Sequence, residues 1–273
     1  MKIQLSKVTL NIEEFRNSSS SKNYLFFLHG FSGSSSDWNE IIPRINNDFK
    51  IFAVDLVGHG QSDSPDDVSL YTTKSMVEQL YQVIKKITEE KIILAGYSMG
   101  GRAALSFKAN HPEIIKGLIL ESSSAGIIDE QQRLERIQSD EKLAQFIENH
   151  SMEEFVDYWM NIDLFKSQKN LPKSILTNVR KSKLKNNKTG LANSLRGFGQ
   201  GIMPHLHNDV KNISIKTLLI SGELDLKYAK INYELSKLFS HAQHITIKNA
   251  GHNIHLEQPS SFANVINNFL SEF

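Results

Sequence analysis

Short apolar blocks of strand length recur along the chain, and no other feature of the sequence constrains the fold as strongly. Each block is rich in branched or aromatic residues and is followed by a polar or glycine-containing turn. Such runs are typical of strands that are buried on both faces of a parallel sheet. Between the second and third blocks, apolar residues recur at helical spacing from Met76 to Ile87, so one face of a helix can pack on the sheet. The blocks span residues 24–28, 51–54, 92–95, 118–120, 217–220 and 245–247.

This alternation of strands and helices predicts an α/β fold with a doubly wound, mostly parallel sheet. It stops near Gly126 and resumes near Lys216, and the residues between them carry helical patterns but no convincing strand. We therefore expect a core domain of residues 1–125 and 210–273, with a helical lid of residues 126–209 inserted in it. Near the N-terminus, one or two antiparallel edge strands are expected before residue 16, and the serines at 18–21 are expected to form a loop.

The composition excludes several classes of function. The 273 residues contain 31 Lys and Arg against 30 Asp and Glu, and this net charge of +1 removes the electrostatic argument for a nucleic-acid protein or a polybasic membrane binder. The chain has no cysteine, which rules out disulfides, cysteine-bound metals and a thiol nucleophile. Polar residues interrupt the first ten positions, and no apolar run approaches the roughly 18 residues of a membrane span. We expect a cytoplasmic protein.

The expected lid contains a strongly basic stretch. Residues 164–208 include nine Lys and Arg and no acidic residue. The simplest interpretation is a solvated basic face, balanced by the acidic residues that precede it between Glu148 and Asp163. Individual arginines of the stretch remain free to face inward.

The residues Gly-Tyr-Ser-Met-Gly-Gly at 96–101 come directly after one expected strand and before an expected helix. A serine at so tight a strand-to-helix turn needs Gly96 and Gly100, because a Cβ at either position would clash with the crossing backbone. The turn presents the Ser98 hydroxyl at the carboxyl edge of the sheet, where open α/β folds place their sites. A phosphate loop is the alternative, but it would end in Lys followed by Ser or Thr. The pattern favours a nucleophile elbow.

A serine hydroxyl needs a histidine and an orienting carboxylate to become reactive, and in the elbow fold the acid comes before the histidine in the chain. Asp225 lies in the loop after the fifth apolar block, and His252 lies in the loop after the sixth. Asp225 can thus hold one imidazole nitrogen while the other meets Ser98. Glu223 and His255 are the rivals. Glu223 follows its strand too closely, and His255 is expected to lie beyond the turn and to support the loop.

The loop after the first block, Leu-His-Gly-Phe-Ser-Gly at 28–33, supplies a third part of the site. In this architecture an oxyanion hole uses one backbone N–H from that loop and one from the residue after the nucleophile, which gives Phe31 and Met99. His29 is expected to be a structural turn residue. The sequence has no metal-binding motif such as His-Glu-x-x-His, and His205 with His207 is too little for a metal site.

Together with Asp-Leu-Val-Gly-His-Gly-Gln-Ser at 55–62, these motifs resemble the α/β-hydrolase superfamily over nearly the whole chain. Val57 departs from the superfamily pattern, which usually has proline there, at a turn remote from the proposed chemistry. More narrowly, the chain resembles the 2-succinyl-6-hydroxy-2,4-cyclohexadiene-1-carboxylate synthases, which are lyases of menaquinone biosynthesis. The stretches that carry this resemblance are His-Gly-Phe at 29–31, the elbow with Arg102, Leu-Ala-Asn-Ser-Leu-Arg-Gly at 191–197 and Gly-His-Asn-Ile-His at 251–255.

The resemblance also implies how a substrate binds. The substrate of the family carries three carboxylates that arginines bind, and a guanidinium suits a carboxylate because it can donate two parallel hydrogen bonds. By resemblance, Arg102, Arg136 and Arg180 are the candidate arginines, and Tyr97 and Trp159 match aromatic positions of the pocket. Arg102 comes one helical turn after the serine, so its side chain can lean back over the site. A surface ion pair is the alternative for each arginine, and a core position is the alternative for Trp159.

The function that the resemblance implies is a lyase that eliminates pyruvate from 2-succinyl-5-enolpyruvyl-6-hydroxy-3-cyclohexene-1-carboxylate. In that family the serine, deprotonated with help from the histidine and aspartate, acts as a base and not as a nucleophile. No metal or organic cofactor is required. The expected partner is therefore a small anionic tricarboxylate, with no nucleic acid and no membrane, and the protein is expected to be a monomer or a weak homo-oligomer.

Two other functions stay open at this point. A carboxylesterase or C–C bond hydrolase would use the same three residues covalently and would turn over small activated esters, but it leaves inward arginines unexplained. A signalling receptor on the hydrolase scaffold would turn over slowly and would bind another protein through its lid. The scaffold hosts many activities, so the fold alone does not separate these functions.

Overall fold

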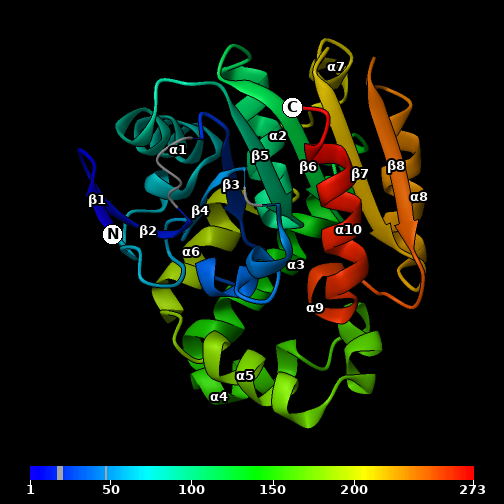
Figure 1. Ribbon diagram of the computed structural model, residues 1–273. Helices are drawn as coiled ribbons and strands as arrows, with labels where there is room; N and C mark the ends of the chain where they lie inside the picture. The colour runs from blue at the N-terminus through cyan, green and yellow to red at the C-terminus, as the bar shows by residue number, and fades with distance from the viewer. Residues whose placement is uncertain (17–20, 47) are drawn as a thin grey trace.

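The computed structural model describes residues 1–16, 21–46 and 48–273, and of the serines expected to form a loop only Ser21 is among them. These residues form an eight-stranded sheet of order β1-β2-β4-β3-β5-β6-β7-β8 (Figure 1). All six apolar blocks lie in parallel strands, which confirms the predicted doubly wound sheet, and β1 and β2 add an antiparallel edge. The strands are β1 (Lys2–Gln4), β2 (Thr9–Arg16), β3 (Tyr24–Leu28), β4 (Lys50–Val54), β5 (Ile92–Tyr97), β6 (Ile115–Glu121), β7 (Lys216–Gly222) and β8 (Ala242–Ile247).

Neighbouring residues of a strand point to opposite faces of the sheet, so the continuous apolar blocks place apolar side chains on both faces. Helices cover both of these faces. Phe26 lies in the core beneath α1, α2 and α8, whereas Phe27 lies in the core on the other face, against α10 and the short helix η1. The chain thus buries two apolar layers around one sheet. The helices of this part are α1 (Thr73–Ile87), α2 (Met99–Asn110), α8 (Leu226–Ser236), α9 (Ile254–Glu257), α10 (Pro259–Leu270), η1 (Ser35–Trp38), η2 (Ile42–Arg44) and η3 (Val68–Tyr71).

The connection between β6 and β7 is helical, and in the part of the chain that the structure describes no strand interrupts it. In Figure 1 helices α4 and α5 lie below the sheet, on the side toward which the strand arrows point. Among the described residues, no helix is both long and apolar enough to cross a membrane. The lid boundaries at 126 and 209 stay a prediction. The helices of the connection are α3 (Glu130–Asn149), α4 (Met152–Trp159), η4 (Asp163–Asn170), α5 (Lys173–Lys183), α6 (Lys188–Phe198) and α7 (His207–Val210).

Helix α6 is mostly buried and is seated directly on the core. At its start, Gly190 lies against Gly58 so closely that an added Cβ would meet the Gly58 carbonyl oxygen and would come within 2.6 Å of Ser64 Oγ. Near its end, an added Cβ on Gly197 would lie 2.6 Å from the Cβ of Tyr71 in η3. The absence of side chains at these two positions therefore lets α6 pack backbone to backbone on the loops after β4.

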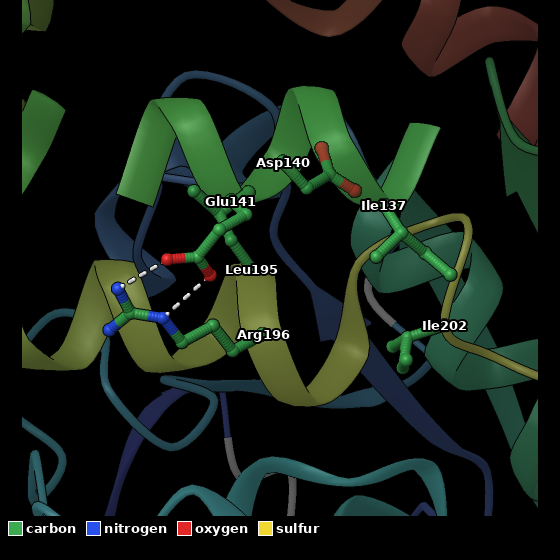
Figure 2. A pocket seen from close by; sticks show the side chains of 6 residues that line it. All are labelled: Ile137, Asp140, Glu141, Leu195, Arg196 and Ile202. Carbon is green, nitrogen blue, oxygen red and sulfur yellow. Dashed lines mark hydrogen bonds and ion pairs between the residues drawn. The ribbon is translucent and has the colours of Figure 1, made fainter. Parts of the chain in front are cut away.

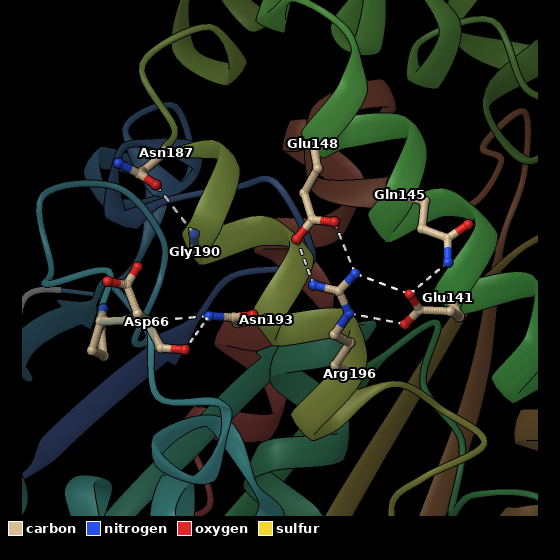
Figure 3. Close-up of polar contacts among 9 residues, drawn as sticks. Asp66, Glu141, Gln145, Glu148, Asn187, Gly190, Asn193 and Arg196 are labelled. Atoms are coloured by element: carbon tan, nitrogen blue, oxygen red, sulfur yellow. Dashed lines mark hydrogen bonds and ion pairs between the residues drawn. The ribbon is translucent and has the colours of Figure 1, made fainter.

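Arg196 joins α6 to α3 (Figure 3). Its guanidinium donates two hydrogen bonds to Glu141, both 2.9 Å long, and two to Glu148, of 2.5 and 2.9 Å. These bonds raise the pKa of Arg196 and hold the pKa of both carboxyls below their usual range. Beside this network a cavity of about 250 Å³ remains between the two helices (Figure 2). The residues that line it are Ile137, Asp140, Glu141, Leu195, Arg196 and Ile202.

Replacing Gly190 by alanine should separate α6 from the core. We expect Gly190→Ala to lower the free energy of unfolding by about 1–3 kcal/mol, the usual cost of forcing extra atoms into a packed contact. Urea denaturation followed by circular dichroism measures the change. Lys188→Ala, two residues earlier in the same helix, is the control and should change the free energy of unfolding by about 0.5 kcal/mol or less. Equal stability of both variants would show that the close contact is not required.

Candidate active site

The turn between β5 and α2 has the geometry of a nucleophile elbow. Ser98 lies at the turn with φ 50° and ψ −105°, a conformation that few residues other than glycine adopt. A Cβ on Gly96 would meet the Gly100 carbonyl group, and a Cβ on Gly100 would meet the Leu28 carbonyl group. Both glycines are therefore needed for the reason that the sequence suggested, and the serine is left partly exposed at the carboxyl edge of the sheet.

The structure brings Ser98, His252 and Asp225 together. His252 Nδ1 lies 2.6 Å from Asp225 Oδ2, and His252 Nε2 lies 3.0 Å from Ser98 Oγ. The imidazole is buried, and Asp225 is fixed because its other oxygen accepts a hydrogen bond from the Tyr228 N–H at the start of α8. With Nδ1–H donating to the carboxylate, Nε2 is the acceptor for the serine proton. The rival carboxylate, Glu223, instead accepts a hydrogen bond from the Asn249 N–H.

The loop expected to form an oxyanion hole lies beside the elbow. His29 is fully buried and holds this loop, since its Nδ1 lies 2.7 Å from the Gly30 carbonyl oxygen and its Nε2 accepts a hydrogen bond from Leu56 N–H. Its structural role was expected from the sequence. Among the described residues, neither the Phe31 N–H nor the Met99 N–H donates to a backbone acceptor. Met99 is also the first residue of α2, where the helix dipole favours negative charge.

Arg102 is the buried cation closest in sequence to the serine. Its guanidinium donates to the Phe198 carbonyl oxygen at 2.8 Å and lies 5.0 Å from the centre of the Phe198 ring. Burial, together with the charge of Arg136, lowers the pKa of Arg102 to about 10, so the group stays protonated at neutral pH. The charge of Asp140 acts in the opposite direction and raises the pKa of Arg102, although the two side chains form no direct ion pair among the described residues. A buried charge without a direct carboxylate contact is costly, so an anionic ligand at this position would stabilise it.

The other two candidate arginines are placed differently. Arg136 is half-buried, pairs with Asp140 at 2.8 Å and donates to the Gln200 side chain at 2.8 Å. Arg180 makes a two-pronged pair with Asp157 on the exposed part of α5, with Nε 2.7 Å from the carboxylate. In this structure Asp157 satisfies the Arg180 guanidinium at the surface, which is the alternative that the sequence left open, and a contact of Arg180 with a substrate stays a prediction.

Lys183, one turn after Arg180, reaches the site instead. Its Nζ donates to Ser32 Oγ at 3.0 Å, next to Phe31 in the loop that contributes to the expected oxyanion hole. Burial lowers the pKa of Lys183. Sequence analysis missed this residue because it lies in a uniformly basic stretch, in which nothing distinguishes one lysine from its neighbours.

Aromatic side chains form a wall near the imidazole. The Trp159 ring packs edge-on against Phe31 at 5.3 Å and against Phe165 at 5.6 Å, and Phe165 lies 6.1 Å from His252. The Trp159 indole N–H is buried and has no acceptor among the described residues. Tyr97 lies behind the histidine, with its ring 5.5 Å from that of His252. Phe165 was not singled out from the sequence, where only its apolar character and its place in the lid could have pointed to it.

Within the described ranges no group of three or more His, Cys, Asp or Glu side chains is placed to hold a metal ion.

The sheet topology and the Ser98, His252 and Asp225 geometry define an α/β hydrolase, and the profile of the alpha/beta hydrolase fold family matches residues 23–259. The chain is 41% identical over 247 residues to a Bacillus subtilis (strain 168) protein named as a candidate 2-succinyl-6-hydroxy-2,4-cyclohexadiene-1-carboxylate synthase, with 89% of each chain covered. It is 31% identical over 245 residues to the synthase of that name from Enterobacter sp. (strain 638), with 88% of each chain covered. The solved structure of MenH from S. aureus matches with a TM-score of 0.90 at 33% identity and covers 96% of this chain and 98% of that one. Within the α/β-hydrolase family, the chain therefore belongs with the 2-succinyl-6-hydroxy-2,4-cyclohexadiene-1-carboxylate synthases.

The reactivity of Ser98 should depend on the Asp225 carboxylate. Asp225→Asn keeps the shape of the side chain but favours the wrong imidazole tautomer, so we expect the rate of Ser98 labelling by a fluorophosphonate to fall by about a thousandfold or more. Intact-protein mass spectrometry over time measures this rate. Glu223→Gln, the rival acid from the same loop, is the matched control and should label as fast as the wild type. Equal loss in both variants would contradict the assignment of Asp225.

Proposed function

We propose that the protein is a lyase that eliminates pyruvate from 2-succinyl-5-enolpyruvyl-6-hydroxy-3-cyclohexene-1-carboxylate to give 2-succinyl-6-hydroxy-2,4-cyclohexadiene-1-carboxylate. The observation that carries the proposal is the hydrogen-bonded chain from Ser98 through His252 to Asp225, with a buried arginine, Arg102, one helical turn after the serine. The names of the relatives support the same reaction.

In the proposed reaction Ser98 acts as a base. His252 accepts the proton of the Ser98 hydroxyl, and the serine oxygen removes a proton from a ring carbon of the substrate. The electron pair of that C–H bond forms a new ring double bond, the electron pair of the existing ring double bond moves one position along the ring, and the C–O bond to the enolpyruvyl group breaks. The group leaves as the enolate of pyruvate, takes the proton that His252 holds and tautomerises to pyruvate.

Two sets of groups assist this elimination. Negative charge builds on the conjugated carbonyl of the substrate, and the Phe31 and Met99 amides are the donors proposed to stabilise it, a contribution typically worth about 3–4 kcal/mol per donor. Arg102, Arg136 and Lys183 are the cations proposed to bind the carboxylates and to fix the substrate in a reactive pose.

The direct test compares two reactions of the purified protein. Substrate made freshly by the preceding enzyme should yield pyruvate and the conjugated diene in equal amounts, followed by a coupled lactate dehydrogenase assay and by absorbance of the diene. A small activated ester should be turned over slowly in comparison. Rapid ester turnover with an accumulating acyl-serine, and no pyruvate, would favour a carboxylesterase and contradict the proposal.

Removing the base should stop the reaction without preventing binding. We expect Ser98→Ala to lower the rate of pyruvate release by at least about a thousandfold, because no other group takes the ring proton. Calorimetric titration with fresh substrate should show a dissociation constant close to the KM of the wild type. Turnover near the wild-type rate would mean that Ser98 is not the base.

Removing the buried cation should weaken substrate capture. We expect Arg102→Ala to raise KM by about tenfold to a hundredfold, the worth of a charge-assisted hydrogen bond, with a smaller effect on kcat. Arg44→Ala, which removes an exposed arginine paired with Glu40, is the control and should leave KM unchanged. An unchanged KM in Arg102→Ala would assign the carboxylates to other groups.

A further inference from the structure

A second acid and imidazole pair lies next to the first. Glu121, the last residue of β6, and His255, in α9, are 1% and 2% exposed. His255 Nδ1 lies 2.7 Å from Glu121 Oε2. The other carboxylate oxygen accepts hydrogen bonds from the Ile254 N–H at 2.7 Å and the His255 N–H at 3.0 Å. The carboxylate therefore makes three hydrogen bonds to the residues that lie two and three positions after His252.

Glu121 connects two segments of the candidate active site. Its backbone carbonyl oxygen accepts a hydrogen bond of 2.8 Å from the N–H of Ser98, at the elbow. Its side chain holds the backbone two and three residues after His252. One residue thus fixes the position of the loop that carries the imidazole relative to the turn that carries the hydroxyl.

The ring of His255 connects the remaining segments. It packs on Trp38 at 4.4 Å between ring centres, and Trp38 lies in η1, directly after the loop of the expected oxyanion hole. It also meets the ring of Tyr97 edge-on at 5.0 Å, and Tyr97 lies between the two imidazoles. The pair is therefore in contact with the elbow, the histidine loop and the segment after β3.

Stability alone gives a weak reason for such a pair. A buried carboxylate and imidazole contribute little net free energy of folding compared with apolar side chains of similar size, because both groups must be desolvated. The pair instead fixes the orientation of the loop that carries His252, because each of its three hydrogen bonds holds one donor of that segment in place. A displacement of about 1 Å in a catalytic group can cost about a hundredfold in rate.

We propose that Glu121 and His255 are positioning residues that hold His252 at hydrogen-bonding distance from Ser98. The inference deepens the proposed function and rests on it for the effect on pyruvate release. Neither residue touches the substrate in this proposal. Both act through the imidazole of His252.

Three variants and one control test the inference. Glu121→Gln and His255→Leu should each lower kcat for pyruvate release by about tenfold to a hundredfold and leave KM nearly unchanged. The rate of Ser98 labelling by a fluorophosphonate should fall by the same factor. His255→Asn should restore most of this rate, because its side-chain N–H can take the place of Nδ1–H. His244→Leu removes another imidazole hydrogen bond, to Ser221 Oγ at 2.7 Å, and should react like the wild type.

A cooperative thermal unfolding transition shows whether each variant is folded. If Glu121→Gln does not fold, the comparison of His255→Leu with His255→Asn alone tests the positioning role. The inference is overturned if the folded variants label and turn over like the wild type, if His255→Asn is no better than His255→Leu, or if His244→Leu is equally slow. The labelling reaction needs no substrate, so its outcome is separate from the proposed function. If the wild-type protein labels rapidly but releases no pyruvate, only the proposed function is contradicted. The positioning role is still supported in that case if labelling is slow only in Glu121→Gln and His255→Leu.

Discussion

The turn between β5 and α2 is the constraint on which the site depends. Ser98 keeps a left-handed backbone conformation only because its N–H is held by the Glu121 carbonyl oxygen and because Gly96 and Gly100 leave room for the crossing chain. Strained backbone of this kind persists where the surrounding structure over-determines it. The parallel strands on both sides of β5 supply that surrounding structure. All the parallel strands end at the same edge of the sheet, so the loops that carry Asp225 and His252 begin at the edge where Ser98 lies.

Electrostatic balance distinguishes the inside of the site from its surroundings. On the outer surface of the inserted helices, arginines are paired: Arg196 with two glutamates and Arg180 with Asp157. Inside, Arg102 is balanced only by the charge of Asp140 without a direct ion pair, and the indole N–H of Trp159 has no acceptor in the described chain. The surface arginines are thus paired directly with carboxylates, whereas Arg102, held by the Phe198 carbonyl oxygen, is not.

The sequence predicts the sheet, and the meeting of Ser98, Asp225 and His252 at one edge of it, because both depend on local patterns. Continuous apolar blocks define the strands, and Gly96 and Gly100 define the turn, so the edge that carries Ser98, Asp225 and His252 follows from topology. Positions in the inserted helices are harder, because there the direction of a side chain depends on packing between distant helices. Arg180 and Lys183 illustrate this: they are one turn apart in one basic helix, yet one pairs with Asp157 and the other reaches Ser32.

The helical segment between β6 and β7 has a second role that follows from the sheet. These two strands are parallel neighbours, so the chain that leaves the carboxyl end of β6 must travel back along the sheet before β7 can begin. The segment is therefore the crossover connection between β6 and β7 as well as the expected lid. A shortened protein in which Glu121 is joined directly to Lys216 would lose the return path and with it the parallel pairing of β6 and β7. Truncation designs that aim to expose the serine must retain a bridging helix, and an isolated sheet without it is not a foldable unit.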